Sequence, residues 1–114
     1  MHLPEFTKKL IESKLTEYCE RKIPIHARDR VKLIFSIRGN NVTLFLTKPY
    51  YHNPSSWIEY PVAQFRYDNK TNRWNLYSAD KYSKWHLYAE SKPSSNINDL
   101  LKEVDSNLTG IFWD

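Results

Sequence analysis

An alternation of apolar and polar residues begins at Val31 and restricts this part of the chain to β-structure. Apolar side chains stand at every second position, at Val31, Leu33, Phe35 and Ile37 and again at Val42, Leu44 and Leu46. Between the two runs, Gly39-Asn40-Asn41 supplies residues that tolerate a positive φ. Because a period of two places one set of side chains on one face of a strand, residues 31–46 are predicted to form a β-hairpin with one apolar face.

Three further strands are predicted after the hairpin. A loop is expected first at Lys48–Ser56, because Pro49 and Pro54 cannot donate a hydrogen bond to a central ladder. The third strand covers about Ile58–Tyr67, with Pro61 confining its first half to an edge or a bulge. A polar turn, a fourth strand at Arg73–Ser78, a short turn at Ala79–Tyr82 and a fifth strand at Ser83–Ala89 complete the series. Every connection is short enough to join antiparallel neighbours.

Amphipathic helices are predicted at both ends of the chain. The first runs from about Pro4 to Lys22, and its apolar stripe consists of Phe6, Leu10, Ile11, Leu15, Tyr18 and Cys19. The second begins at the N-cap Asn96 and ends near Gly110, with an apolar face of Ile97, Leu100, Leu101, Val104 and Leu108. The apolar tail 111–114 is expected to close the core. We therefore expect one α+β domain, 1–114, in which a five-stranded antiparallel β-meander has the N-terminal and C-terminal helices packed on one face.

Composition limits the classes of function. The 114 residues include 17 Lys and Arg against 13 Asp and Glu, a net charge of +4. The bases gather in residues 21–48 and the acids in residues 90–114, an asymmetry that can attract an anionic partner. The single cysteine, Cys19, excludes an internal disulfide framework and a cysteine-rich zinc site, and it is expected to be a buried thiol. Because no stretch has the pattern of a signal peptide or a membrane span, we expect a cytoplasmic protein without a membrane partner.

Two motifs make the chain resemble a known family. The first is Lys84-Trp85-His86 followed by Tyr88, and the second is Gly110 followed by Phe112-Trp113. Together with six further residues, these motifs are similar to the pattern of a family of small bacterial proteins known as domain of unknown function thirty twenty-four, and the similarity covers nearly the whole chain. The six residues are Ala63, Phe65, Trp74, Leu76, Tyr77 and Asp80. The chain departs from that pattern at Leu46-Thr47-Lys48-Pro49, where the family has Glu-x-Arg-Pro, and at Lys81, where it has arginine. The resemblance implies a single bacterial cytoplasmic domain and supplies no activity.

If the apolar side chains face the helices, the other face of the sheet stays open. Its charged residues are all expected to be basic, and tyrosines and a histidine are expected beside them. Cations beside aromatic rings suit single-stranded nucleic acid, because cations hold phosphates while rings stack on bases. The sequence therefore predicts a small, non-enzymatic binding module for an anionic partner, with single-stranded nucleic acid as the leading candidate. The predicted binding residues are Lys32, Arg38, Arg66, Arg73, Tyr77, Lys84, His86 and Tyr88.

Other interpretations stay open. The face could be merely solvated, with aromatic side chains that pair across strands. A protein-interaction subunit or a homodimer would use Phe45, Tyr77 and Tyr88 as anchors. An enzyme would use the hairpin that carries Tyr77, Asp80, Lys84 and His86, although Asp80 also fits a simple turn residue. The four histidines are widely spaced and the chain has two glycines, so no metal and no nucleotide cofactor are expected.

Overall fold

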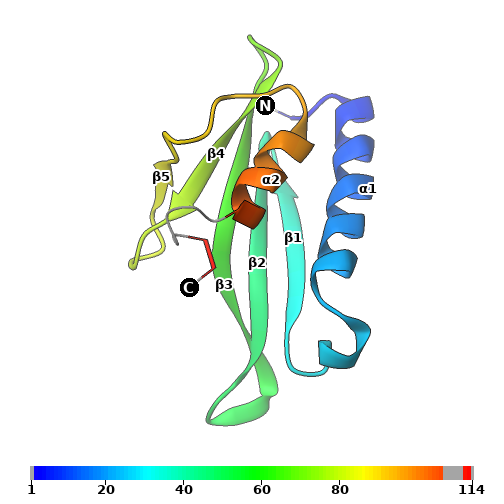
Figure 1. The fold of residues 1–114 in the computed structure, drawn as a ribbon, viewed down its shortest axis with the longest axis vertical. Helices are drawn as coiled ribbons and strands as arrows, with labels where there is room; N and C mark the ends of the chain where they lie inside the picture. The colour runs from blue at the N-terminus through cyan, green and yellow to red at the C-terminus, as the bar shows by residue number, and fades with distance from the viewer. Residues whose placement is uncertain (1, 107–111, 114) are drawn as a thin grey trace.

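The computed structural model describes residues 2–106 and 112–113. Its elements, in chain order, are α1 (Glu5–Lys22), the 3₁₀ turn η1 (Ile25–Ala27), β1 (Lys32–Arg38), β2 (Asn41–Tyr50), β3 (Asn53–Asp68), β4 (Arg73–Ala79), β5 (Trp85–Leu87) and α2 (Ile97–Ser106) (Figure 1). The strands follow one another across the sheet in the order β1-β2-β3-β4-β5, and each neighbouring pair is antiparallel. The predicted meander between two helices is therefore confirmed.

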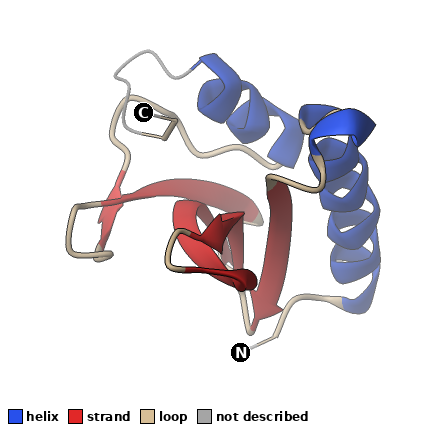
Figure 2. Ribbon diagram, turned by 90° about the horizontal axis from the view of Figure 1, so that it is seen from below, coloured by secondary structure: helices blue, strands red, loops and turns tan. Residues whose placement is uncertain are grey.

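Both helices cover the same face of the sheet, as predicted (Figure 2). One apolar cluster joins Ile11, Leu15 and Tyr18 of α1 and Leu100, Leu101 and Val104 of α2 to the strand residues Leu33, Val42, Leu44, Phe65, Trp74 and Leu76. The first turns of α1 differ from the prediction, since Phe6 is 79% exposed and Leu10 is 43% exposed. The apolar residues of α1 that pack in the core begin only at Ile11, so the amphipathic pattern in the sequence starts earlier in the helix than the buried contacts do.

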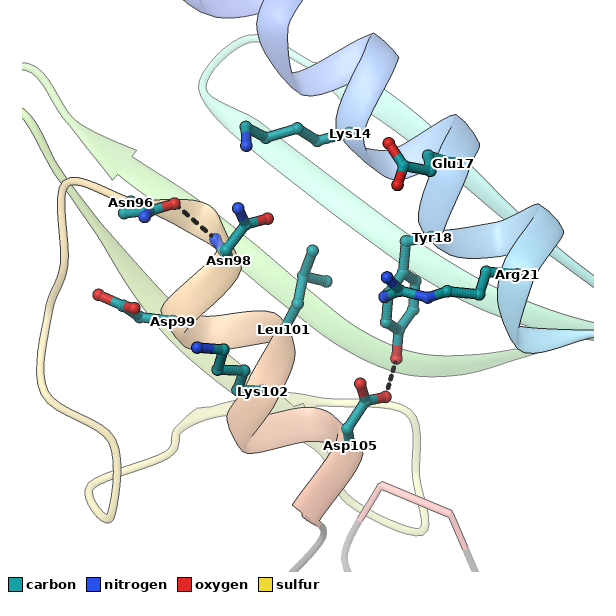
Figure 3. Close-up of a pocket in the computed structure, with 10 residues that line it drawn as sticks. All are labelled: Lys14, Glu17, Tyr18, Arg21, Asn96, Asn98, Asp99, Leu101, Lys102 and Asp105. Carbon is teal, nitrogen blue, oxygen red and sulfur yellow. Dashed lines mark hydrogen bonds between the residues drawn. The ribbon is translucent and has the colours of Figure 1, made fainter.

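Polar contacts fasten α1 to α2 (Figure 3). The hydroxyl of the buried Tyr18 donates a hydrogen bond to Asp105 Oδ1 at 2.7 Å, and Lys22 Nζ donates to the same oxygen at 3.1 Å. Burial, and then the hydrogen bond to Asp105, raise the pKa of Tyr18 above its usual range. The predicted N-cap is also confirmed, because Asn96 Oδ1 accepts a hydrogen bond from the backbone N–H of Asn98 at 3.0 Å.

Phe112 and Trp113 lie against the core near the end of the chain. Phe112 is buried and packs edge-on against Tyr88, with 4.9 Å between the ring centroids. Trp113 Nε1 donates to the carbonyl oxygen of Val104 at 2.9 Å. The predicted closing tail is confirmed for these two residues. The predicted positions Leu108, Gly110, Ile111 and Asp114 lie outside the described residues.

The predicted loop at Lys48–Ser56 is wrong, because β2 and β3 continue through it as a two-stranded arm (Figure 1). These two strands stay paired as far as Tyr50 and Asn53. In contrast, β1 pairs with β2 only up to Thr47, and β4 pairs with β3 only from Ala63 onward. Each arm strand therefore has a neighbour on one side alone, and proline is tolerated because the outer side needs no donor.

Pro61 marks the place where the arm meets the full sheet. Leu44 pairs with Ala63 and the next residue, Phe45, pairs with Pro61. This register shift leaves Val62 as the extra residue of a β-bulge, and Val62 is buried. The prediction that Pro61 confines the first half of the third strand to an edge or a bulge is confirmed.

The fifth strand is shorter than predicted, and each of its side chains lies on the face of the sheet opposite to the predicted one. It spans Trp85–Leu87, and the turn before it occupies residues 80–84, with Ser83 at φ 62°. Tyr77 pairs with Leu87. Paired residues share a face, so Trp85 and Leu87 lie on the open face of the sheet. The predicted turn, Ala79–Tyr82, pairs Tyr77 with Lys84, which lies three positions before the actual partner, Leu87. A shift by an odd number of residues moves every side chain of a strand to the other face.

Candidate functional site

The open face consists of rows of side chains, because residues paired across antiparallel strands project to the same side. The row nearest the β1–β2 turn contains Arg38, Asn41, Arg66 and Asn75. The next row contains Ser36, Thr43, Gln64, Tyr77 and Leu87. Beyond the bulge, one row contains Ile34, Phe45 and Pro61, the next contains Lys32, Thr47 and Glu59, and Pro49 and Trp57 follow on the arm. One end of the face is therefore polar and basic, and its middle is apolar.

The open face of the sheet is concave (Figure 2). A groove lies on this face. It encloses about 480 Å³ and is lined both by Ile34 and Arg38 of β1 and by Ser83 and Trp85 from the other end of the sheet. Since β1 and β5 are the two outermost strands, only a strongly curved sheet can bring residues from both to one groove. The apolar part of the lining is formed by Ile34, Phe45, Pro61 and Trp85.

Arg66 is held in place at the basic end of this face. Its Nε donates to Gln64 Oε1 at 2.6 Å, and Gln64 Nε2 donates to Thr43 Oγ1 at 2.9 Å. Gln64 and Thr43 are both buried, so the anchor of Arg66 is fixed by packing. The guanidinium carbon lies 3.9 Å from the centroid of the Tyr77 ring. Nε is thus occupied, while the terminal Nη groups make no hydrogen bond to any described residue and can bind a ligand.

A second cavity of about 320 Å³ adjoins this pair. Arg66 and Tyr77 line it together with Asn75 and with Lys70 of the β3–β4 turn. Asn40, also in the lining, donates through Nδ2 to the carbonyl oxygen of Tyr67 at 3.2 Å. The cavity therefore combines a stacked guanidinium, a lysine and side-chain amides, groups that can bind phosphate oxygens and base edges.

Five of the eight predicted binding residues share the open face. Lys32, Arg38 and Arg73 are exposed there, and Arg66 and Tyr77 are half-buried. The expectation that its charged residues are all basic is wrong, because Glu59 pairs with Thr47 and Asp68 pairs with Arg73 on this same face. Four bases and two acids leave the face with a positive balance.

Three of the predicted binding residues do not lie on the open face of the sheet: Lys84, His86 and Tyr88. His86 pairs with Ser78, which faces the helices, and Tyr88 is buried against Phe112. Lys84 belongs to the turn before β5. The register shift in that turn explains the misplacement, and it also places Trp85, which lies between Lys84 and His86 in the sequence, on the open face.

The hairpin considered for catalysis forms a structural clamp. Asp80 Oδ2 lies 2.7 Å from His86 Nε2, and Asp80 Oδ1 accepts backbone hydrogen bonds from Tyr82 at 2.8 Å and Lys84 at 2.9 Å. The hydrogen bond to His86, followed by that to the backbone of Lys84, lowers the pKa of Asp80. Tyr77 faces the other side of the sheet, so the set imagined for acid–base work is not assembled. The role of Asp80 as a turn residue is confirmed.

Residues 2–106 and 112–113 contain no group of three His, Cys, Asp or Glu side chains arranged to hold a metal ion. Within the same residues, neither helix has the length and apolar character needed to cross a membrane.

The chain matches a known protein family. The family described as "Domain of unknown function (DUF3024)" matches residues 3–114, in agreement with the motifs around Trp85 and Trp113. Neither the curated proteins nor the solved structures contain a significant match.

Proposed function

The chain belongs to the family described as a domain of unknown function (DUF3024), and we propose that it is a small cytoplasmic binding module whose open sheet face takes single-stranded nucleic acid. The observation that carries the proposal is Arg66, which Gln64 fixes over the ring of Tyr77 with its terminal nitrogens left available. A guanidinium held in this way offers a plane on which a base can stack and donors for a phosphate.

The surroundings of Arg66 support an anionic, extended ligand. Arg38, Arg73 and Lys32 are exposed on the same face and outnumber its two carboxylates. The apolar groove beside them is open, and Phe45 and Trp85 in its lining offer rings to further bases. Base–ring stacking contributes roughly 1–3 kcal/mol per base, so two or three stacks with several phosphate contacts are enough for measurable affinity.

A protein partner is the second candidate, and the groove is the observation that favours it. Leu87 is 57% exposed on the same face as the groove, whose apolar lining includes Ile34 and Phe45. Tyr88, expected to be an anchor, is buried and unavailable. Salt distinguishes the two candidates, because phosphate contacts release counterions and apolar contacts do not.

The test is fluorescence anisotropy with a labelled random 12-nucleotide single strand at about 50 mM and then about 200 mM salt. Four phosphate contacts predict a fall in affinity of roughly 50-fold between the two. Arg38→Gln and Arg66→Gln are each expected to weaken binding. The matched control is Lys9→Gln, which removes one exposed charge from α1 on the other side of the molecule.

Three results would overturn the proposal. The first is the absence of binding at the lower salt concentration. The second is an affinity that does not change with salt, which would indicate apolar contacts instead. The third is an equal loss in Lys9→Gln and in the open-face variants, which would indicate an attraction by net charge alone.

A further inference from the structure

The open face carries a second pair of a cation and an aromatic ring, at the end opposite to Arg66. Lys32 Nζ, from the first residue of β1, lies 4.8 Å from the centroid of the Trp57 ring on the arm. Trp57 keeps 38% of its surface exposed. Lys32 shares its row with Thr47 and Glu59, and Trp57 precedes Glu59 by two residues on the same strand, so the pair projects from the open face.

The two pairs lie along one line with the groove between them. Trp57 and Arg66 are both on β3, separated by nine residues and one bulge, which corresponds to about 30 Å of strand. Phe45 and Pro61, which line the groove, are placed between them in the register. The open face thus has a stacking pair, an apolar groove and another stacking pair in succession.

The arm is suited to bind a ligand through aromatic side chains and not through backbone pairing at a strand edge. Its outer edges are free of β1 and β4, but Pro49, Pro54 and Pro61 interrupt them and have no N–H to donate. Prolines and charges on an edge strand prevent pairing with another strand. On the arm, the groups suited to a ligand are therefore the side chains of Trp57 and Lys32, a ring and a cation like those of Tyr77 and Arg66.

We propose that Lys32 and Trp57 form a second stacking subsite for the same nucleic-acid strand, which runs along β3 across the groove to Arg66 and Tyr77. This inference rests on the proposed function and adds a length requirement to it. A strand stacked at about 3.4 Å per nucleotide needs about nine nucleotides to cover 30 Å, and a more extended strand needs fewer. Tight binding therefore requires an oligonucleotide much longer than four nucleotides, within the usual range of site sizes.

The test compares labelled oligothymidylates of 12 and 4 nucleotides at about 50 mM salt. In the wild type, the 12-mer is expected to bind at least tenfold more tightly than the 4-mer. Trp57→Leu and Lys32→Gln should each weaken the 12-mer by about tenfold and change the 4-mer, held at Arg66 and Tyr77, by less than twofold. Trp57→Phe keeps a ring and should retain most of the affinity for the 12-mer.

Phe6→Leu is the matched control, since it removes an aromatic ring that is 79% exposed on α1, away from this face. Equal affinities of the wild type for the 12-mer and the 4-mer would overturn the second subsite, and so would a Trp57→Leu variant that behaves as Phe6→Leu does. In both cases the loss of binding in Arg66→Gln would leave the proposed function standing. If neither oligonucleotide binds the wild type, both proposals are wrong.

Discussion

Gln64 is a positioning residue, and its substitution separates the geometry of Arg66 from its charge. Gln64→Leu removes the 2.6 Å hydrogen bond to Arg66 Nε and the 2.9 Å hydrogen bond to Thr43 Oγ1. A hydrogen bond to a charged group contributes about 1.5–3 kcal/mol and a neutral one about 0.5–1.5 kcal/mol. Water can reach the half-buried Arg66, and the leucine gains apolar contacts, so we expect a net loss of about 1.5 kcal/mol in the free energy of unfolding.

The effect on binding follows from the freedom that Arg66 regains. Ordering a long side chain costs about 0.5–1.5 kcal/mol, so Gln64→Leu should weaken the binding of single-stranded DNA by roughly two- to tenfold. Gln64→Glu should act differently, because a carboxylate strengthens the contact with the guanidinium while cancelling its charge. We expect Gln64→Glu to leave stability nearly unchanged and to lower the affinity more than Gln64→Leu does.

Urea denaturation and fluorescence anisotropy on the same three proteins measure both quantities. For a chain of this length, 1.5 kcal/mol corresponds to a fall of about 6 °C in the melting temperature. The reasoning is refuted if Gln64→Leu keeps full affinity, because Arg66 would then need no positioning. It is equally refuted if Gln64→Glu binds as tightly as the wild type, because the charge of Arg66 would then play no part.

Three further predictions concern other parts of the molecule. Tyr18→Phe removes the 2.7 Å hydrogen bond to Asp105 that joins the helices, and it should lower the free energy of unfolding by about 1–2 kcal/mol in urea denaturation. The pKa of Asp80 is lowered in the fold, so the clamp with His86 should be intact above about pH 4 and be lost as the pH falls through the folded pKa. Hydrogen exchange should show this as a loss of protection of the amides in the β4–β5 turn. In Asp80→Asn, the protection of these amides should no longer change over this pH range. Burial raises the pKa of Cys19 to about 11, so alkylation by iodoacetamide should be slow at pH 7 and accelerate only towards pH 11.

The parts of the fold that the sequence predicts correctly are those where local pattern and tertiary packing agree. The period-two run from Val31 to Leu46 forms paired strands, and Asn96 caps α2 as its side chain suggests. The prolines between Lys48 and Ser56 predict a loop only if each strand there has a neighbour on both sides. In the arm each strand has a neighbour on one side only, so a proline can lie in it without breaking a ladder of hydrogen bonds. The local sequence does not indicate how many neighbours a strand has.

The binding face depends on the number of residues in each turn, which is harder to infer than the presence of a turn. The turn between β4 and β5 occupies residues 80–84 instead of Ala79–Tyr82, and this odd shift in register moves His86 and Tyr88 away from the open face and brings Trp85 onto it. The signal available in the sequence was Asp80 followed by Ser83, a residue pair suited to a turn that closes with a positive φ.

The curvature of the sheet has a clearer local cause, and it links the fold to the proposed binding site. The bulge at Val62 increases the local twist where the full sheet meets the arm, and β4 pairs with β3 only from Ala63 onward, so Pro61 needs no N–H for a second neighbour. This bend turns the open face into a groove shared by β1 and Trp85, and it leaves Trp57 projecting beyond the groove. A flat sheet with the same side chains would present Tyr77 and Trp57 on one plane, with no hollow to exclude water between them. The bulge therefore matters for binding as well as for packing.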